Sequence, residues 1–184
     1  DWRYEEAWNI IREENPFPGV CGRVCFHPCE SHCNRAEYDE TIAIKALERF
    51  VADQAPPLKP GPNVGKRRKE RVAIVGSGPS GLSCAYHLAR MGYGVTVFEA
   101  LPQPGGILRT GIPSYRLPKD VLDKEIADIQ AYGVEIKTNT RLGGDLSFED
   151  LQEYEAIFIA TGAHVSRKLN IPGEDDYPTF SQCA

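Results

Sequence analysis

The stretch Arg71-Val-Ala-Ile-Val-Gly-Ser-Gly-Pro-Ser-Gly81 decides the fold of this 184-residue chain. Its apolar run at 72–75 predicts a short buried strand, and the residues that follow the last glycine predict a helix. A Gly-x-Gly-x-x-Gly loop between a strand and a helix is typical of dinucleotide binding. Gly76 permits the tight turn, Gly78 lets the backbone approach a pyrophosphate, and Gly81 lets helix and strand pack closely. A purely structural glycine turn is the alternative, which the strand–loop–helix setting disfavours.

Beyond this loop the chain alternates between strand and helix patterns. A helix is expected from Pro118 to about Ala131, and Ser147 to Asp150 resembles a capping box before a short helix. Further strands are predicted at 94–98, 134–137 and 156–160, the last of them buried. Strands that alternate with helices imply a parallel sheet with right-handed crossovers. We therefore expect an α/β Rossmann-like domain over 71–184.

The residues around the glycine loop favour FAD as the dinucleotide. Glu99 ends the second predicted strand, where its carboxylate can bind a ribose hydroxyl pair and would disfavour the 2′-phosphate of NADP. The pair Gly105 and Gly106 follows and would let the backbone pass close to the flavin. Thr161 and Gly162 form a second small turn after the strand at 156–160. The three features in this order predict an FAD site.

Composition narrows the class of protein. Hydrophobic residues make up 41% and charged residues 26% of the chain, as in ordinary globular proteins. The formal net charge of −5 argues against nucleic acid as the main partner. No apolar run approaches the ~20 residues that cross a bilayer, and no signal-peptide pattern occurs, so a cytoplasmic location without a membrane span is expected. The chain opens on Asp1 rather than Met, so we expect that its true start is missing.

Residues 1–54 form a separate helical, cysteine-bearing region. Tyr4, Ala7, Trp8 and Ile11 recur at helical spacing, and the helix must stop at Asn15-Pro-Phe-Pro18. A second stripe consists of Ala43, Leu47, Phe50 and Val51, and we expect both stripes to pack in a core. Residues 55–70 then form a Pro/Gly-rich basic linker. Its basic run, which ends at Arg71, is either a solvated surface or a docking patch for an acidic partner.

Cys21, Cys25, Cys29 and Cys33 are separated by three residues each. A disulfide framework is disfavoured, because the chain carries a nucleotide-binding motif and no export signal. On an unbroken helix the outer sulfur atoms would lie ~18 Å apart, too far for one cluster. Either Gly22 and Pro28 break the helix around one site, or the ligands are divided between sites. Thiolates in this number suit iron–sulfur clusters or zinc, and the predicted flavin favours iron–sulfur.

The other thiols and the imidazoles near the array have weaker signals. His27 and His32 could be ligands or hydrogen-bond donors around the site, or could only cap and pack. Cys84 lies in the first helix of the nucleotide domain and is expected in its core. Cys183 carries no usable signal.

Four segments resemble the small chain of glutamate synthase. They are Asn15-Pro-Phe-Pro-Gly-Val-Cys-Gly-Arg-Val-Cys25, Pro28-Cys-Glu-Ser-His-Cys33, Ile42-Ala-Ile-Lys-Ala-Leu-Glu-Arg-Phe50 and Gly111-Ile-Pro-Ser-Tyr-Arg-Leu-Pro-Lys119. The same module occurs in the N-terminal half of dihydropyrimidine dehydrogenase, in electron-bifurcating ferredoxin:NADP oxidoreductases and in electron-input subunits of larger complexes. The resemblance covers nearly the whole chain.

The resemblance implies a multidomain protein, in which a small all-α domain with two [4Fe-4S] clusters precedes an FAD domain and an NAD(P)H domain. In the dihydropyrimidine dehydrogenase arrangement, the positions of Cys25 and Cys29 serve one cluster and that of Cys33 serves the other. The position of Cys21 is not a ligand there, and Glu48 falls where that relative uses a side-chain oxygen. The FAD contacts implied by the family are Ser77, Gly78, Pro79, Ser80, Gly81, Glu99, Gly105, Gly106, Ile107, Arg116 and Leu142.

Two parts of the family pattern are absent from the sequence. The first cysteine array of the family would lie before Asp1. The second glycine fingerprint, for NAD(P)H, and the final FAD segment would lie after Ala184. We therefore expect the chain to be a fragment of something longer, and we do not expect the fragment alone to oxidise NAD(P)H.

Three functions compete. The first is a flavin and iron–sulfur electron-transfer subunit of an NAD(P)H-dependent oxidoreductase, which passes electrons to a larger partner subunit. No side chain then needs to act as an acid or base, because the cofactors carry the chemistry. The second is a flavin reductase with structural zinc, and the third is a non-catalytic docking module of a complex. The terminal acceptor and the choice of NADH or NADPH are left open by these motifs.

Overall fold

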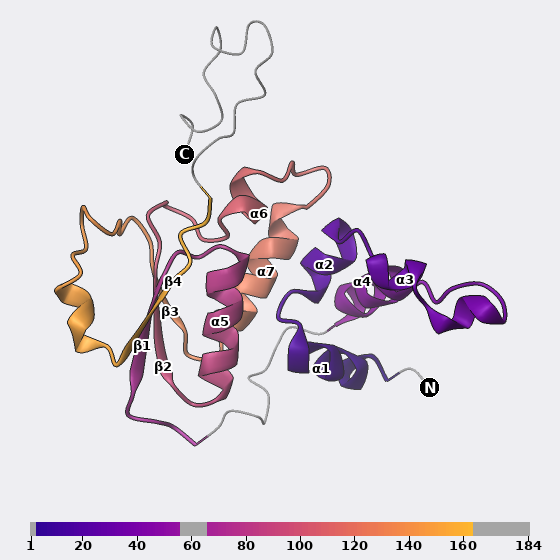
Figure 1. Ribbon diagram of the computed structural model, residues 1–184, viewed down its shortest axis with the longest axis horizontal. Helices are drawn as coiled ribbons and strands as arrows, with labels where there is room; N and C mark the ends of the chain where they lie inside the picture. The colour runs from indigo at the N-terminus through magenta and orange to yellow at the C-terminus, as the bar shows by residue number, and fades with distance from the viewer. Residues whose placement is uncertain (1–2, 56–65, 164–184) are drawn as a thin grey trace, which may run out of the picture.

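The computed structural model describes residues 3–55 and 66–163, so most of the predicted linker and Cys183 lie outside the described residues. An all-α part is followed by an α/β part (Figure 1). The all-α part consists of α1 (Tyr4–Glu14), α2 (Pro18–Val24), α3 (Pro28–Ser31), the 3₁₀ turn η1 (Asn34–Glu37) and α4 (Ile44–Gln54). The predicted class, helices before a Rossmann-like domain, is confirmed.

The first helix follows its apolar stripe and ends at a proline. Trp8 is buried, whereas Tyr4, Ala7 and Ile11 are half-buried. Asn15 adopts an extended conformation, because the ring of a following proline disfavours helical geometry. Pro18 then opens α2, where the missing N–H of proline leaves no hydrogen bond unmade.

The α/β part is built on one parallel sheet with the strand order β3-β2-β1-β4. Its elements in chain order are β1 (Arg71–Val75), α5 (Pro79–Arg90), β2 (Gly94–Phe98), α6 (Ile107–Thr110), α7 (Lys119–Gln130), β3 (Glu135–Lys137), the 3₁₀ turn η2 (Asp150–Glu153) and β4 (Ala156–Ile159). Val75 is paired with Phe98 on one side and with Ile159 on the other. The strands β1, β2 and β4 therefore end at one edge, where ligands bind in sheets of this kind.

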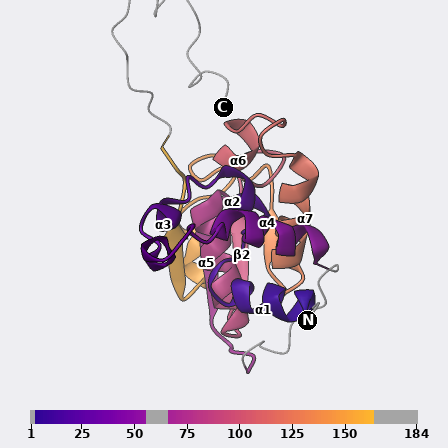
Figure 2. The ribbon, with the colours of Figure 1, turned by 90° about the vertical axis from the view of Figure 1, so that its right-hand side faces the viewer.

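The two faces of the sheet are covered differently. Ile74 and Val97 face α5 and α7 in a core that also contains Phe17 and Val20 of the all-α part. Figure 2 shows the α1–α4 part in front of α5 and β2. The opposite face is covered by apolar side chains of 142–154. The two parts thus share one core.

The capping motif after β3 forms as the sequence predicts. The side chain of Ser147 accepts the amide of Asp150 at 3.2 Å, and the Asp150 carboxylate accepts the amide of Ser147 at 2.8 Å. These reciprocal bonds satisfy amides that have no acceptor inside the turn. The helix that follows is the single 3₁₀ turn η2.

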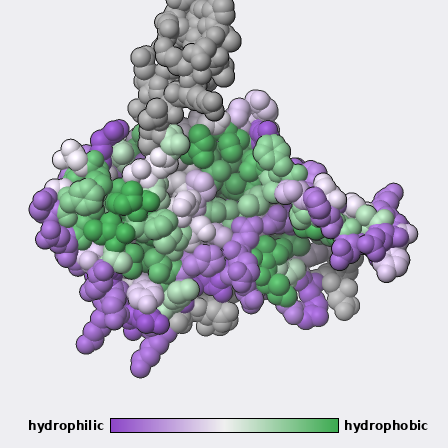
Figure 3. Space-filling model, viewed as in Figure 1, coloured by the Kyte–Doolittle hydropathy of each residue, from purple (hydrophilic) through white to green (hydrophobic). Residues whose placement is uncertain are grey.

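Two predicted apolar surfaces are not buried. All four residues of β4 are exposed, although its sequence predicts a buried strand; Figure 3 shows hydrophobic surface there. β4 is one of the two edge strands of the described sheet, and no described segment covers it. On α4, Leu47 is 56% and Phe50 47% exposed, and Ala43 before it is also exposed, so the prediction that this stripe packs in a core is wrong for these residues. Of that stripe only Val51 is half-buried, beside Trp8.

The longest described helices, α5 and α7, have 12 residues each. Within 3–55 and 66–163, no helix combines the length and the apolar character that a membrane crossing requires.

Candidate functional site: a dinucleotide loop beside a cysteine-bearing helix

The glycine loop sits at the carboxyl edge of the sheet, between β1 and α5. Gly76 has φ +105°, and a Cβ there would lie 2.3 Å from the carbonyl oxygen of Ala160. A Cβ on Gly81 would lie 2.0 Å from the carbonyl oxygen of Gly76. Around Gly78, in contrast, a Cβ would meet nothing within 4 Å. Two of the glycines therefore allow close packing, and Gly78 leaves open space for a ligand.

The start of α5 provides the groups that bind phosphate. Pro79 and Ser80 open the helix and are exposed, and the first-turn amides of a helix have no intrahelical acceptor. The helix dipole adds positive potential at the same place. The loop thus fits the pyrophosphate of a dinucleotide.

Glu99 lies beside this loop and is 7% exposed. Its Oε2 accepts the amide of Ser77 at 2.9 Å and also the hydroxyl of Ser77. Its Oε1 accepts the amide of Leu101 at 2.9 Å. Because a carboxylate oxygen can accept two hydrogen bonds, Oε1 keeps a lone pair for a ribose hydroxyl.

The second glycine pair closes onto the first loop. The Gly105 amide donates to the carbonyl of Ser77 at 3.0 Å. Gly106 has φ +50°, and a Cβ there would lie 2.7 Å from the Cα of Gly78. Thr161 also lies close to the loop, since a Cβ on Gly76 would lie 3.2 Å from its Cα. The structure therefore brings together the three glycine-containing turns that the sequence singles out.

The remaining predicted FAD residues lie in different surroundings. Ile107 begins α6 directly after the glycine pair and is 62% exposed. Arg116 is exposed, and its guanidinium lies 5.8 Å from the ring centroid of Phe26, within the cysteine array. Leu142 packs with Leu146 and others against the face of the sheet opposite α5. Gly162 has φ +81° and follows the exposed strand β4.

The cysteine array is not one helix. Cys21 lies within α2 and Cys25 ends it, Cys29 lies in α3, and Cys33 precedes η1. The break is at 25–27, where His27 has a positive φ of 45°. Of the two residues expected to break the helix, Pro28 does open a new one.

Gly22 does not break the helix, although one of the two alternatives requires it to. It lies inside α2, where a Cβ would be 2.7 Å from the Cα of Arg49. This glycine therefore lets α2 approach α4 closely.

The four thiols have unequal environments. Backbone hydrogen bonds from Ile42 and Arg35 hold the pKa of the half-buried Cys33 thiol below its usual value. Cys25 accepts the amide of His27 at 3.3 Å. Burial raises the pKa of Cys21, whose thiol donates to Asn15 Oδ1 at 3.8 Å. Since metals bind thiolates, Cys33 and Cys25 fit a ligand role better than Cys21 does.

Asn15 connects Cys21 to Glu48, the predicted oxygen ligand. Its Nδ2 donates to Glu48 Oε1 at 2.7 Å, while its Oδ1 accepts the amide of Phe17. Burial raises the pKa of Glu48, and Glu48 in turn helps to raise that of Cys21. Cys21 and Glu48 thus meet between α2 and α4.

The histidines of the array make local contacts. His27 Nδ1 lies 3.1 Å from a carboxylate oxygen of Glu30, and His32 Nδ1 lies 3.2 Å from the carbonyl oxygen of Pro28. Among the residues that the structure describes, no three His, Cys, Asp or Glu side chains converge as metal ligands. The cysteines therefore do not form a closed ligand set by themselves in these ranges.

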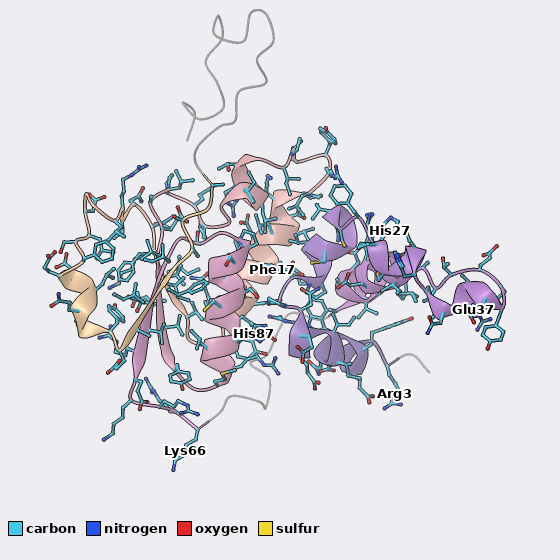
Figure 4. The ribbon with its side chains drawn as sticks, viewed as in Figure 1. Arg3, Phe17, His27, Glu37, Lys66 and His87 are labelled. Atoms are coloured by element: carbon cyan, nitrogen blue, oxygen red, sulfur yellow. The ribbon has the colours of Figure 1, made fainter. Side chains whose placement is uncertain are left out.

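Helix α2 packs directly on the dinucleotide-binding part, and Figure 4 labels Phe17 where the two meet. Glu125 of α7 accepts the amides of Gly19 and Val20 at the start of α2. Sequence reasoning missed Glu125, although a signal was present. It interrupts the apolar stripe of α7 between Leu122 and Ile129.

Comparison with known proteins agrees with both halves of the chain. Residues 1–58 match the family described as dihydropyrimidine dehydrogenase domain II, 4Fe-4S cluster. Residues 74–126 match the NAD(P)-binding Rossmann-like domain. The β subunit of NADP(+)-dependent formate dehydrogenase from Moorella thermoacetica is 47% identical over 96% of the chain. The chain belongs to the glutamate synthase small-chain-like family.

Other members of the family are similarly close. The β subunit of NADPH-Fe(3+) oxidoreductase from Geobacter sulfurreducens is 45% identical over 95% of the chain. The glutamate synthase [NADPH] small chain of Bacillus subtilis is 39% identical over 94%. The chain spans 28%, 27% and 36% of the length of these three relatives, in the order given.

Among solved structures, Mycobacterium tuberculosis FprA in complex with NADPH is similar to part of the chain. The TM-score is 0.52 with 32% sequence identity, and the similarity covers 59% of this chain and 26% of FprA. The family match and this likeness confirm a 4Fe-4S cluster domain joined to a Rossmann-like dinucleotide domain, as the sequence predicts.

Proposed function

We propose that this chain is the flavin-binding and cluster-binding portion of an NAD(P)H-dependent oxidoreductase subunit that delivers electrons to a partner subunit. One observation carries the proposal: the cysteine-bearing helix α2 shares a core with the helices that hold the dinucleotide loop. Two cofactors held on such surfaces would lie in one rigid unit. This arrangement suits electron transfer better than it suits two independent binding modules.

In this proposal the residues at the sheet edge hold FAD by its polar groups. The first-turn amides of α5 bind the pyrophosphate over the open space at Gly78. Glu99 accepts a ribose hydroxyl, and the Gly105–Gly106 backbone passes beside the flavin. When bound, FAD supplies the step between two-electron hydride chemistry and one-electron transfer.

The cysteines would hold [4Fe-4S] clusters. Cys25 and Cys33 are supported by the backbone N–H groups that stabilise their thiolates, and Cys29 by its exposed place on α3. We assign Cys21 no ligand role, because burial raises the pKa of its thiol, which donates a hydrogen bond to Asn15. Glu48 stays a candidate oxygen ligand. Ligands from outside the described ranges would complete the sets.

Partner, reductant and location follow the family. The relatives are named as β subunits or small chains, which supports a larger electron-accepting partner. Three names refer to NADP(+) or NADPH, which supports NADPH as the reductant, bound on a separate domain. Free thiols that serve as metal ligands suit the reducing cytoplasm, where we place the protein.

The test is anaerobic reduction of the purified full-length protein. We expect bound FAD, iron and acid-labile sulfide, and bleaching of both flavin and cluster absorption on addition of NADPH. Zinc without iron would select a flavin reductase with a structural metal, and a colourless protein would select a docking module. The subunit that co-purifies identifies the terminal acceptor.

A further inference from the structure

The side chain of Glu125 caps the cysteine-bearing helix from another part of the chain. Its Oε1 lies 2.5 Å from the amide of Gly19, and its Oε2 lies 3.0 Å from the amide of Val20. Phe17, the N-cap residue of α2, makes no side-chain capping bond. The first-turn amides, which have no acceptor inside the helix, therefore depend on a carboxylate more than a hundred residues away.

The same helix, α7, also holds the end of α1. Arg12 forms a buried ion pair with Asp128 at 3.1 Å, one turn beyond Glu125 on α7. Its guanidinium lies 5.0 Å from the ring centroid of Tyr86 on α5. The Tyr86 hydroxyl donates to the backbone carbonyl of Arg12 at 2.7 Å. Helices α5 and α7 thus hold α1 and α2 at neighbouring points.

Burying a carboxylate at this position is energetically unfavourable by itself. Glu125 is 2% exposed, and the burial of a charge is unfavourable unless hydrogen bonds compensate for the lost water. An apolar side chain would fill the same space without that cost. The two carboxylate oxygens of Glu125 accept two consecutive backbone amides of α2. This pair of bonds fixes the position of α2 along its own axis and its rotation about that axis.

Gly19 is matched to this carboxylate. A Cβ on Gly19 would lie 2.9 Å from Glu125 Oε1 and 3.2 Å from Val121. Any larger residue would therefore push the carboxylate away from the helix start. The start of α2 therefore has a residue small enough to admit the Glu125 carboxylate, and the carboxylate accepts the amide of that residue.

We propose that Glu125 is a positioning residue for electron transfer, which holds α2, and with it Cys25, at a fixed distance from the flavin loop. The inference rests on the proposed function, in which Cys25 is a cluster ligand and the loop binds FAD. Because the rate of electron transfer falls as the distance between donor and acceptor grows, a shift of α2 should alter transfer without altering either cofactor.

The first readout is amide hydrogen exchange in the full-length protein, which requires no turnover. In Glu125→Ala the amides of Gly19 and Val20 should exchange about tenfold faster or more, because each loses a hydrogen bond to a charged group. In Glu125→Gln, which keeps one acceptor oxygen, the exchange rates of these two amides should lie between those of the wild type and Glu125→Ala. The exchange rates of the α5 amides should be unchanged in both variants. In the control Asp120→Ala, which changes an exposed acid of α7, the exchange rates of the α2 and α5 amides should all match the wild type.

The second readout separates the two electron-transfer phases after rapid mixing with NADPH. Flavin bleaching should keep its rate in all variants, and cluster bleaching should slow in the order wild type, Glu125→Gln, Glu125→Ala, by about tenfold or more for alanine. Gly19→Ala should also slow the cluster phase, although the carboxylate is still present. If Glu125→Ala does not fold, Gly19→Ala still tests whether the position of α2 controls the rate of cluster reduction.

The outcomes distinguish the two proposals. If the variants lose α2 protection but cluster bleaching keeps the wild-type rate, Glu125 is only structural and the inference is wrong. If the wild-type protein itself shows no cluster phase, the proposed function fails instead.

Discussion

Gly76 and Gly78, two positions apart in the dinucleotide loop, are needed for different reasons. At Gly76 the backbone has a positive φ and a Cβ would overlap the Ala160 carbonyl. At Gly78 φ is −70° and the space is open. The first glycine is therefore required by the protein and the second by its ligand.

Alanine at each glycine should separate these roles. Gly76→Ala should lower the free energy of unfolding by roughly 2 kcal/mol or more, because it combines backbone strain with a clash. Gly78→Ala should leave that free energy within about 1 kcal/mol. Its bound flavin should nevertheless fall about tenfold or more, because the methyl group occupies the phosphate approach. Urea unfolding and released flavin measure the two effects, and normal flavin content in Gly78→Ala would contradict the site.

The unequal thiols predict unequal losses of iron. Cys33→Ala in the full-length protein should remove the iron of one cluster, since backbone hydrogen bonds favour its thiolate. Cys21→Ala should keep its iron, because burial raises the pKa of that thiol and it donates a hydrogen bond to Asn15. Iron and acid-labile sulfide analysis of both proteins gives the answer. Equal losses would return Cys21 to the ligand set.

At the scale of the element, the sequence predicts well whether a segment is a helix or a strand, but predicts poorly which of its faces are buried. The four strands and the helices α5 and α7 lie where apolar periodicity predicts them, because that pattern is local. Whether an apolar strand is covered depends on what packs beside it. β4 and the outer face of α4 carry apolar residues that nothing covers in the described ranges.

The candidate site shows the same division. Glycine-containing turns can be predicted from the sequence, because each depends on a local backbone conformation. The structure places the three predicted turns next to one another. The break in the cysteine array falls at His27, whose left-handed backbone no residue type announces. The interrupted apolar stripe of α7 marks Glu125 as unusual, but the helix that it caps lies 106 positions away, and one sequence does not identify that partner.

The cap on α2 also predicts a pH dependence. Burial raises the pKa of Glu125 to about 7, partly offset by the amides of Gly19 and Val20 and by Arg12, while Asp128 adds to the rise. The folded state then binds the proton more tightly than the unfolded chain, whose carboxyl titrates near 4.5. The free energy of unfolding should therefore fall by roughly 3 kcal/mol between pH 4.5 and 7 from this group alone.

Glu125→Gln is the matched control for that slope. The difference in unfolding free energy between wild type and variant, measured in urea at several pH values, should follow the same curve. The upward pKa shift of Glu48 contributes in the same direction but cancels in the difference. A difference that stays constant from pH 4.5 to 8 would contradict the assignment.

At the scale of the whole molecule, the all-α and α/β parts are joined through one core and one buried ion pair. Arg12→Ala removes the pair with Asp128 and the contacts with Trp8, Tyr86 and Tyr132. We expect a loss of roughly 3 kcal/mol in the free energy of unfolding, the usual scale for breaking a buried pair.

An exposed ion pair on the same helix provides the comparison. Arg3 pairs with Glu6 at the surface of α1, and Arg3→Ala should change stability by about 0.5 kcal/mol or less. Circular dichroism during urea unfolding compares the variants. In Arg12→Ala the all-α part should also unfold before the sheet, giving two transitions, and one unchanged transition would show that the ion pair does not couple the parts.

The cap from Glu125 has a consequence for synthesis of the protein. Val20 leaves the ribosome 105 residues before the side chain that receives its amide. At 5–20 residues per second, this delay lasts roughly 5–20 s. During that interval the first-turn amides of α2 have no carboxylate to accept them, so α2 reaches its final hydrogen bonding only after α7 has been synthesised.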